Sequence, residues 1–149
     1  MAQLTLAERM EQAIRKYIQA CNNGDAAAIS ACFRPDAMHY APGFSRWSGA
    51  TVIGANFEKR VTDTGQWWTV DQILTDAKRS AAVLEWTRFD PSRRHILRGV
   101  DWFVFDGETL HIREVRTYLA ARPDPNPPRQ ELQDFDYAAC GYPTTFPDQ

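Results

Sequence analysis

The chain has 149 residues, of which 24% are charged and 12% are aromatic, and its formal net charge at pH 7 is −2. One globular domain of this size buries enough surface to fold without a metal ion or disulfide bridges. No basic stripe is present that could follow a nucleic-acid backbone, and no run of about 18 apolar residues could span a membrane. We therefore expect neither nucleic acid nor a membrane as a partner.

The N-terminus and the cysteines indicate the compartment. Met1 to Glu8 is polar and mixed, without the basic start and apolar run of a signal peptide. Cys21, Cys32 and Cys140 are odd in number and have neither a CxxC pair nor zinc-ligand spacing. We expect reduced thiols in a cytoplasmic protein, and no bound metal.

The first part of the sequence predicts three helices. Thr5 and Glu8 have the spacing of a capping box, and apolar residues then recur every three or four positions, which predicts an amphipathic helix over 6–22. Asp25 is placed to cap a second, short helix. A third helix is expected over about 49–63.

The remainder is rich in β-branched and aromatic residues, and the strands that we expect are 37–41, 67–75, 80–89, 96–105 and 110–120. Asp106-Gly107 is the strongest hairpin signal between them. Because helices precede a run of strands, the order favours the α+β class, with helices on one face of a curved antiparallel sheet. The apolar residues of the last strand change parity between Ile112 and Val115, which predicts a β-bulge there.

The last 28 residues differ from the part before them. Four prolines between Arg122 and Pro128 indicate a linker, whereas 135–142 (FDYAACGY) is too apolar to remain in solvent. We expect one domain over 1–121, with 122–149 as a linker and a tail of the same domain. The tail should dock over its own pocket or on a second subunit.

Several segments resemble a known superfamily. The stretch 17–33 (YIQACNNGDAAAISACF) resembles the opening of nuclear-transport-factor-2-like proteins. The segments 82–86 (AVLEW), 105–107 (FDG) and 112–118 (IREVRTY) resemble the SnoaL-like (polyketide cyclase) and ketosteroid-isomerase branches. The resemblance implies a cone-shaped fold, in which three N-terminal helices pack on a strongly curved antiparallel sheet around an apolar pocket. It also implies a homodimer, which the outer face of the sheet with Trp102 and Val104 would form.

The resemblance also implies part of a site. Tyr17 and Asp101 match a phenol and a protonated aspartic acid that form the oxyanion hole of ketosteroid isomerases. The catalytic carboxylate of those enzymes falls on Ala41, before Pro42, and Ala41 cannot accept a proton. The aspartate of the SnoaL-type last strand is also missing, since Thr117 to Ala120 has none.

Side-chain alternation completes the candidate catalytic set. If Ala41 faces the pocket, so does His39, whose ordinary pKa near 6.5 suits a general base; the alternative is a histidine bonded to a backbone carbonyl. Asp101 shares a parity with buried phenylalanines and is expected to be protonated, or else paired with Arg98 or Arg113. Tyr17 is either a pocket donor or an ordinary core tyrosine.

Six further residues are candidates for contact with the substrate: Phe103, Glu85, Arg113, Phe57, Trp86 and Thr117. Alternation does not decide which faces of their strands Glu85 and Arg113 occupy. The three histidines have no metal-ligand spacing, and no nucleotide-binding motif is present, so we expect no cofactor.

Three functions remain open. The first is an enzyme that needs no cofactor and moves a proton on a small, largely apolar carbonyl or polyketide-like substrate, as an isomerase, cyclase or dehydratase. The second is a non-catalytic small-ligand-binding or interaction module, which Ala41 favours. The third is epoxide or lactone hydrolysis, which would need Asp101, Glu85 and Arg113 all to face inward.

Overall fold

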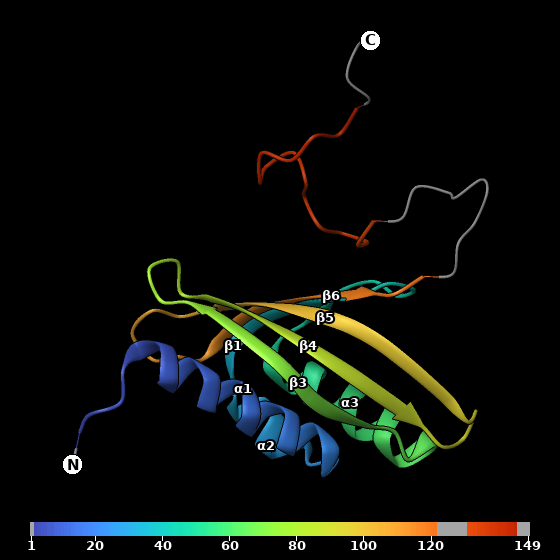
Figure 1. Cartoon of the computed structure of the whole chain (residues 1–149). Helices are drawn as coiled ribbons and strands as arrows, with labels where there is room; N and C mark the ends of the chain where they lie inside the picture. Colours follow the sequence, from blue (N-terminus) through green and yellow to red (C-terminus); the bar gives the residue numbers. More distant parts are fainter. Residues whose placement is uncertain (1, 122–130, 146–149) are drawn as a thin grey trace.

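Three helices cover one face of a single six-stranded sheet in the computed structural model, which describes residues 2–121 and 131–145 (Figure 1). The strand order is β2-β1-β6-β5-β4-β3, and the sheet curves around the helices. The α+β cone predicted from the sequence is confirmed. Within the described ranges, no helix has the length and apolarity that crossing a bilayer requires.

Helix α1 (Leu6–Asn22) begins at the predicted capping box. The backbone amide of Glu8 donates to the Thr5 hydroxyl at 3.2 Å, and the amide of Thr5 donates to the Glu8 carboxylate at 2.7 Å. The buried residues of the helix follow the predicted periodicity and are Met10, Ile14, Tyr17, Ile18, Ala20 and Cys21.

Helices α2 (Ala26–Ala31) and α3 (Ala50–Thr64) pack closely against each other. The carboxylate of Asp25 caps α2 by accepting the third backbone amide of the turn. Gly54 allows the close approach, because a Cβ there would collide with the hydroxyl of Ser30 and with the backbone of α2. This packing fixes the part of α3 that faces the sheet.

Four strands form an antiparallel meander, as predicted: β3 (Trp67–Asp76), β4 (Ala81–Asp90), β5 (His95–Phe105) and β6 (Ile112–Leu119). The predicted bulge is present in β6. Phe105 pairs with Ile112, but Val104 pairs with Glu114, so Arg113 is the extra residue. The bulge brings Ile112 and Val115, which differ in parity, to the same buried face.

Strand β1 (Phe33–Tyr40) differs from the prediction. It pairs parallel to β6, with His39 opposite Val115, so the sheet is mixed rather than wholly antiparallel. The connection from β1 to β6 runs through α3 and the meander, which is long enough for a parallel pairing. The strand also begins four residues before the predicted start. Pro35 does not end it, because the pairing with β6 is interrupted between Phe33 and Met38 and no hydrogen bond from Pro35 is needed there. A two-residue strand, β2 (Trp47–Ser48), was not predicted and pairs with β1 at the sheet edge.

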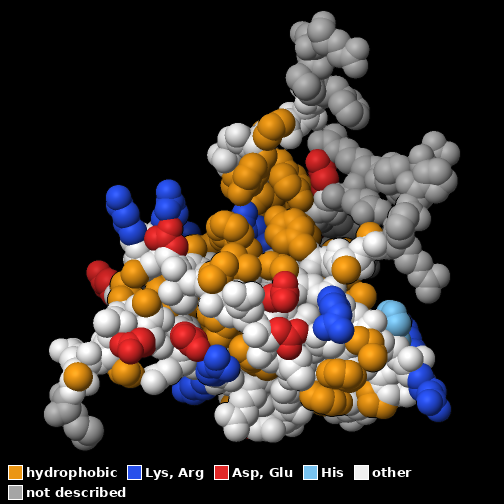
Figure 2. All heavy atoms as spheres, viewed as in Figure 1, with side chains coloured by type: hydrophobic (Ala, Val, Ile, Leu, Met, Phe, Trp, Pro, Cys, Tyr) orange, Lys and Arg blue, Asp and Glu red, His pale blue; other side chains and the backbone are white. Residues whose placement is uncertain are grey.

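The described part of the tail packs on the outer face of the sheet, opposite the helices (Figure 1). Phe135 is buried against Tyr40 of β1, with ring centroids 5.3 Å apart. The guanidinium of Arg116, on β6, lies 5.0 Å from the centre of the Phe135 ring. Figure 2 shows hydrophobic side chains of the tail gathered over this face. The linker predicted for Arg122 to Pro128 lies outside the described residues.

Candidate functional site

A cavity of about 240 Å³ lies between the helices and the inner face of the sheet. Side chains from α1, α3 and the strands β1, β3, β4, β5 and β6 line it. Aromatic rings form much of the wall, and Trp68 and Trp86 are the tryptophans among them. Ala41 faces the cavity beside Pro42, where the resemblance would place a carboxylate base.

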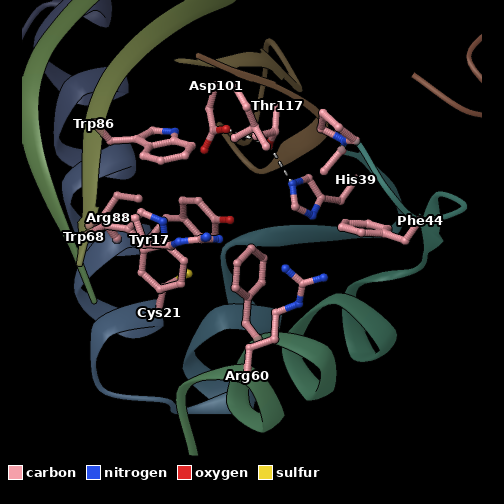
Figure 3. A pocket seen from close by; sticks show the side chains of 15 residues that line it. Tyr17, Cys21, His39, Phe44, Arg60, Trp68, Trp86, Arg88, Asp101 and Thr117 are labelled. Carbon is pink, nitrogen blue, oxygen red and sulfur yellow. Dashed lines mark hydrogen bonds between the residues drawn. The ribbon is translucent and has the colours of Figure 1, made fainter. Parts of the chain in front are cut away.

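Three polar side chains on adjacent strands form a buried hydrogen-bonded chain. The Thr117 hydroxyl donates to Oδ1 of Asp101 at 2.7 Å, and Nε2 of His39 lies 3.1 Å from the same hydroxyl (Figure 3). Asp101 and Thr117 face each other across β5 and β6, and β1 lies on the other side of β6. The expected inward orientation of His39 and Asp101 is therefore observed.

This series of hydrogen bonds determines which nitrogen of His39 carries the proton when Asp101 is ionised. Because the Thr117 hydroxyl gives its proton to the Asp101 carboxylate, its oxygen accepts from Nε2–H of His39. The other nitrogen of His39, Nδ1, is then the acceptor; it is buried and has no hydrogen-bond partner.

Burial makes His39 a much weaker base than its residue type suggests. Desolvation first, and the nearby Arg60 second, lower the pKa of His39 from 6.5 to about 3. Phe57 stacks on the imidazole with centroids 5.4 Å apart. At neutral pH His39 is uncharged and holds a proton poorly, which argues against the general-base role expected from the sequence.

Asp101 is the group in the cavity that titrates near neutrality. Burial raises the pKa of its carboxyl from 3.8 to about 6, against the opposing effects of the Thr117 hydroxyl and the Trp86 indole. About nine-tenths of the carboxyl is ionised at pH 7 with that pKa. The expected upward shift is present, but the carboxyl is mostly charged rather than protonated at neutral pH.

Tyr17 brings a phenol into the cavity from the core face of α1 (Figure 3). Edge-to-face contacts with Phe33, Phe57 and Phe103 hold its ring, with centroids 5.3–6.1 Å apart. Burial raises the pKa of Tyr17 well above its usual value, and the neighbouring Cys21 and Asp101 add to the shift. The phenol therefore stays protonated and can donate a hydrogen bond.

The structure brings together some of the substrate-contact candidates and separates others. Phe57, Trp86 and Thr117 line the cavity, whereas Phe103 packs behind Tyr17 in the core. Glu85 is exposed, because its neighbours Leu84 and Trp86 point inward and strand side chains alternate.

Arg113 is also exposed, at the bulge of β6 and outside the cavity. Of the three residues required for the hydrolase arrangement, only Asp101 therefore faces inward. The expectation that Glu85, Arg113 and Phe103 contact a ligand in this cavity does not fit their positions.

Two arginines in the cavity were not expected from the sequence. Arg60 reaches it from α3 and Arg88 from β4 (Figure 3). Side-chain alternation could have predicted the position of Arg88, because it lies two residues after Trp86 and so on the same face of the strand. Helical spacing could have predicted the position of Arg60, because residues three apart, such as the buried Phe57 and Arg60, lie on the same face of a helix.

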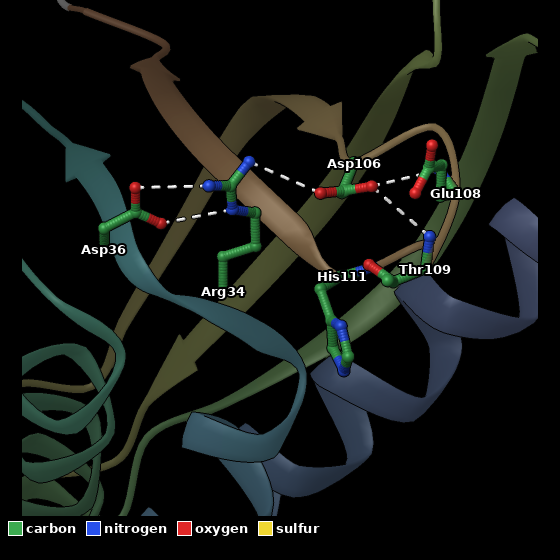
Figure 4. Close-up of polar contacts among 6 residues, drawn as sticks. All are labelled: Arg34, Asp36, Asp106, Glu108, Thr109 and His111. Atoms are coloured by element: carbon green, nitrogen blue, oxygen red, sulfur yellow. Dashed lines mark hydrogen bonds and ion pairs between the residues drawn. The ribbon is translucent and has the colours of Figure 1, made fainter.

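A second polar cluster lies at the β5–β6 turn, outside the cavity (Figure 4). Arg34 of β1 pairs with Asp36 at 3.1 Å and with Asp106 at 3.3 Å. Asp106 also accepts the backbone amides of Glu108 and Thr109. The charged groups of this cluster pair with one another, which indicates that the cluster connects the β5–β6 turn to β1. Within residues 2–121 and 131–145, no three His, Cys, Asp or Glu side chains are grouped to hold a metal ion.

Comparison with known proteins gives a family and a fold. The family model described as SnoaL-like domain matches residues 14–123. No curated protein matches the sequence. A crystal structure from Methylobium petroleophilum, described as a protein of unknown function with a cystatin-like fold, is 36% identical; the alignment covers 99% of both chains with a TM-score of 0.90.

Two more distant structures carry functional descriptions. One, from M. tuberculosis, is described as an LEH-like epoxide hydrolase: it is 20% identical, with a TM-score of 0.66, and the match covers 76% of this chain and 84% of that one. The other is described as an epoxide hydrolase/cyclase-like enzyme in pyran ring formation in polyether salinomycin: it is 16% identical, with a TM-score of 0.63, and the match covers 76% and 92%. At these identities the likeness concerns the fold alone.

Proposed function

Since this chain belongs to the SnoaL-like domain family, we propose that it is an enzyme that moves a proton on a small, largely apolar carbonyl substrate without a cofactor. Polyketide-like ketones are the substrate class that suits the family best. The reaction is an isomerisation, a cyclisation or a dehydration, all of which begin by removing a proton next to a carbonyl group.

The observation that carries the proposal is the environment of Asp101. Its carboxyl faces an aromatic cavity, is held by the Thr117 hydroxyl, and has a pKa of about 6. A general base works best with a pKa near the working pH, where it is ionised but still takes up a proton readily. Asp101 meets this condition at neutral pH and His39 does not.

The proposed roles follow from the protonation states. The Asp101 carboxylate takes the proton from the carbon next to the carbonyl, so that the C–H bond breaks, a carboxylic O–H bond forms and the electron pair moves to the carbonyl oxygen. The Tyr17 phenol donates a hydrogen bond to that developing oxyanion. Thr117 and the neutral His39 orient Asp101. The protonated Asp101 then returns the proton to another carbon, to a departing hydroxyl group or, in a cyclisation, to the oxygen of the second carbonyl group that the enolate carbon attacks.

One observation favours a second candidate, a non-catalytic binding module of the same fold. Ala41 stands in the cavity wall where the resemblance implies a catalytic carboxylate. In that case the cavity binds an apolar carbonyl compound and releases it unchanged.

The two candidates are separated by proton exchange in deuterated water. We expect the wild-type protein to incorporate deuterium next to the carbonyl of small β,γ-unsaturated and β-hydroxy ketones, followed by nuclear magnetic resonance. Asp101→Asn should lower kcat/KM about 100- to 10,000-fold, and Tyr17→Phe about 100- to 1,000-fold. The matched control is Asp63→Asn, an exposed carboxylate on α3, which should change nothing.

The pH profile gives a second readout of the same proposal. In the wild type, kcat/KM should rise with pH and level off above an apparent pKa of about 6, because only ionised Asp101 accepts a proton. Unchanged turnover in Asp101→Asn would remove this residue from the mechanism. If ketones bind but exchange no proton, the non-catalytic binding module is the candidate that remains.

A further inference from the structure

The cavity contains two guanidinium groups that the proposed proton transfer does not use. Arg60 and Arg88 line it together with Asp101: Arg60 reaches it from α3 on the side of His39, and Arg88 reaches it from β4 (Figure 3). Both side chains are of intermediate exposure rather than fully solvated. Charged groups rarely line a small aromatic cavity without a partner.

No carboxylate of the described residues forms an ion pair with either arginine. Asp90, whose charge acts on Arg88, is engaged by the Ser92 hydroxyl at 2.6 Å. The carboxylate that shares the cavity, Asp101, is engaged by Thr117. In addition, Nε of Arg88 is buried and has no hydrogen-bond partner.

Aromatic rings hold Arg60 in place of an anion. Its guanidinium carbon lies 4.8 Å from the centre of the Phe44 ring and 4.9 Å from that of Trp47. Such contacts orient the guanidinium but leave its N–H groups without acceptors. The arginine is therefore positioned in advance for a planar acceptor.

The two guanidinium groups also disfavour each other. Burial, and then the charge of Arg88, lower the pKa of Arg60; burial likewise lowers the pKa of Arg88, which Asp90 opposes. An anion between or beside them would relieve the repulsion and supply the missing acceptors. Without a ligand, the protein retains the electrostatic repulsion between the two arginines. This indicates that the cavity binds an anion that relieves the repulsion.

We propose that the substrate carries a carboxylate, which Arg88 and Arg60 bind while the apolar body lies against the aromatic wall. Two features favour a carboxylate over a phosphate ester, although a guanidinium fork fits both. The volume of about 240 Å³ is below the roughly 300–1,000 Å³ of ordinary ligand sites, so the ligand is compact. The Asp101 carboxylate shares the cavity and would repel a dianion more than a monoanion.

The proposed carboxylate site rests on the proposed function only for the reacting end of the substrate, because the anion can bind without turnover. It predicts a small keto acid or unsaturated acid as the substrate. Its carboxylate would be anchored away from the carbon that Asp101 deprotonates.

The test uses calorimetry at pH 8 on the full chain with three acids and their neutral amides: benzoate, cinnamate and hexanoate against benzamide, cinnamamide and hexanamide. At least one acid should bind about tenfold or more tightly than its amide, since hydrogen bonds to charged groups are worth that much. Arg88→Gln and Arg60→Gln should each remove about tenfold of the acid's affinity and leave the amide within about twofold. Arg9→Gln, an exposed arginine on α1, is the matched control.

Each outcome has a defined meaning. No preference for any acid, or an equal loss for acid and amide in the arginine variants, overturns the proposal. Tighter binding of phenyl phosphate than of any of the acids assigns the arginines to a phosphate ester and overturns the carboxylate. Asp101→Asn should keep the acid preference, so loss of turnover in that variant with the preference intact separates this proposal from the proposed reaction.

Discussion

Among single side chains, Asp101 and His39 illustrate how one cavity shifts two titrating groups in opposite directions. Burial disfavours the charged form of each, so the pKa of Asp101 rises to about 6 while that of His39 falls to about 3. The Thr117 hydroxyl between them allows the ionised carboxylate and the neutral imidazole to share one hydrogen-bonded chain.

These shifts have opposite consequences for stability. Asp101 binds protons more tightly in the folded state than in the unfolded state, so it costs about 3 kcal/mol above pH 6, a cost that disappears as the pH falls below about 4. His39 binds protons more weakly in the folded state, so acidification from 6.5 toward 3 costs up to about 5 kcal/mol. Between pH 4 and 6 the opposite effects of Asp101 and His39 on the pH dependence of the unfolding free energy cancel.

Removing one member of the pair should expose the slope of the other. In Asp101→Asn we expect the free energy of unfolding to fall by about 1.4 kcal/mol per pH unit, relative to wild type, as the pH goes from 6 to 4. His39→Gln should show a relative rise of similar size. Urea unfolding at several pH values measures both, and curves that stay parallel to wild type would contradict the shifts.

For the secondary-structure elements, the cavity depends on one close approach between β4 and β5. Trp86 lies opposite Gly99, and a Cβ on Gly99 would overlap the indole ring and approach the Tyr118 carbonyl oxygen. The missing side chain of Gly99 leaves room for the Trp86 indole, which lines the cavity.

Gly99→Ala should therefore force the Trp86 indole to move. Overpacking of this kind costs about 1–3 kcal/mol of folding stability, and the shifted indole should also weaken ligand binding in the cavity. Thermal unfolding and calorimetry with the acid probes above measure both effects. Gly107→Ala is the control, because a Cβ there meets only the Ser80 hydroxyl, at 3.3 Å; equal effects from the two changes would contradict the role of Gly99.

Local signals predicted the elements well, and the misses have physical causes. The capping box at Thr5 and Glu8 and the parity change in β6 are short-range features, so they gave α1 and the bulge. The two residues of β2 are too few for any periodicity, and the parallel pairing of β1 is a tertiary choice.

The site was predictable to the extent that alternation determines it. Alternation placed His39 and Asp101 inward, but their connection through Thr117 depends on the register of three strands. The exposure of Glu85 follows from Trp86 pointing inward, which the sequence left undecided. The pKa values depend on burial, which no single residue type reveals.

For the whole molecule, the outer face of the sheet carries an exposed apolar row that the tail does not cover. Phe135 and Leu132 pack over the β1 side. Toward β3, Leu74 and Trp102 are 64% and 39% exposed and lie in the row that joins β3, β4 and β5. A contiguous apolar patch on the surface of a folded domain is typical of an association site.

We propose that this face pairs with a second copy of the chain. Sedimentation velocity should give twice the chain mass of 17.0 kDa, and Trp102→Lys combined with Leu74→Lys should give a stable monomer, because a buried unpaired charge opposes association. Leu4→Lys, an exposed apolar residue before α1, should leave the dimer intact. A wild-type chain that stays monomeric at the highest protein concentration tested would contradict the proposed dimer.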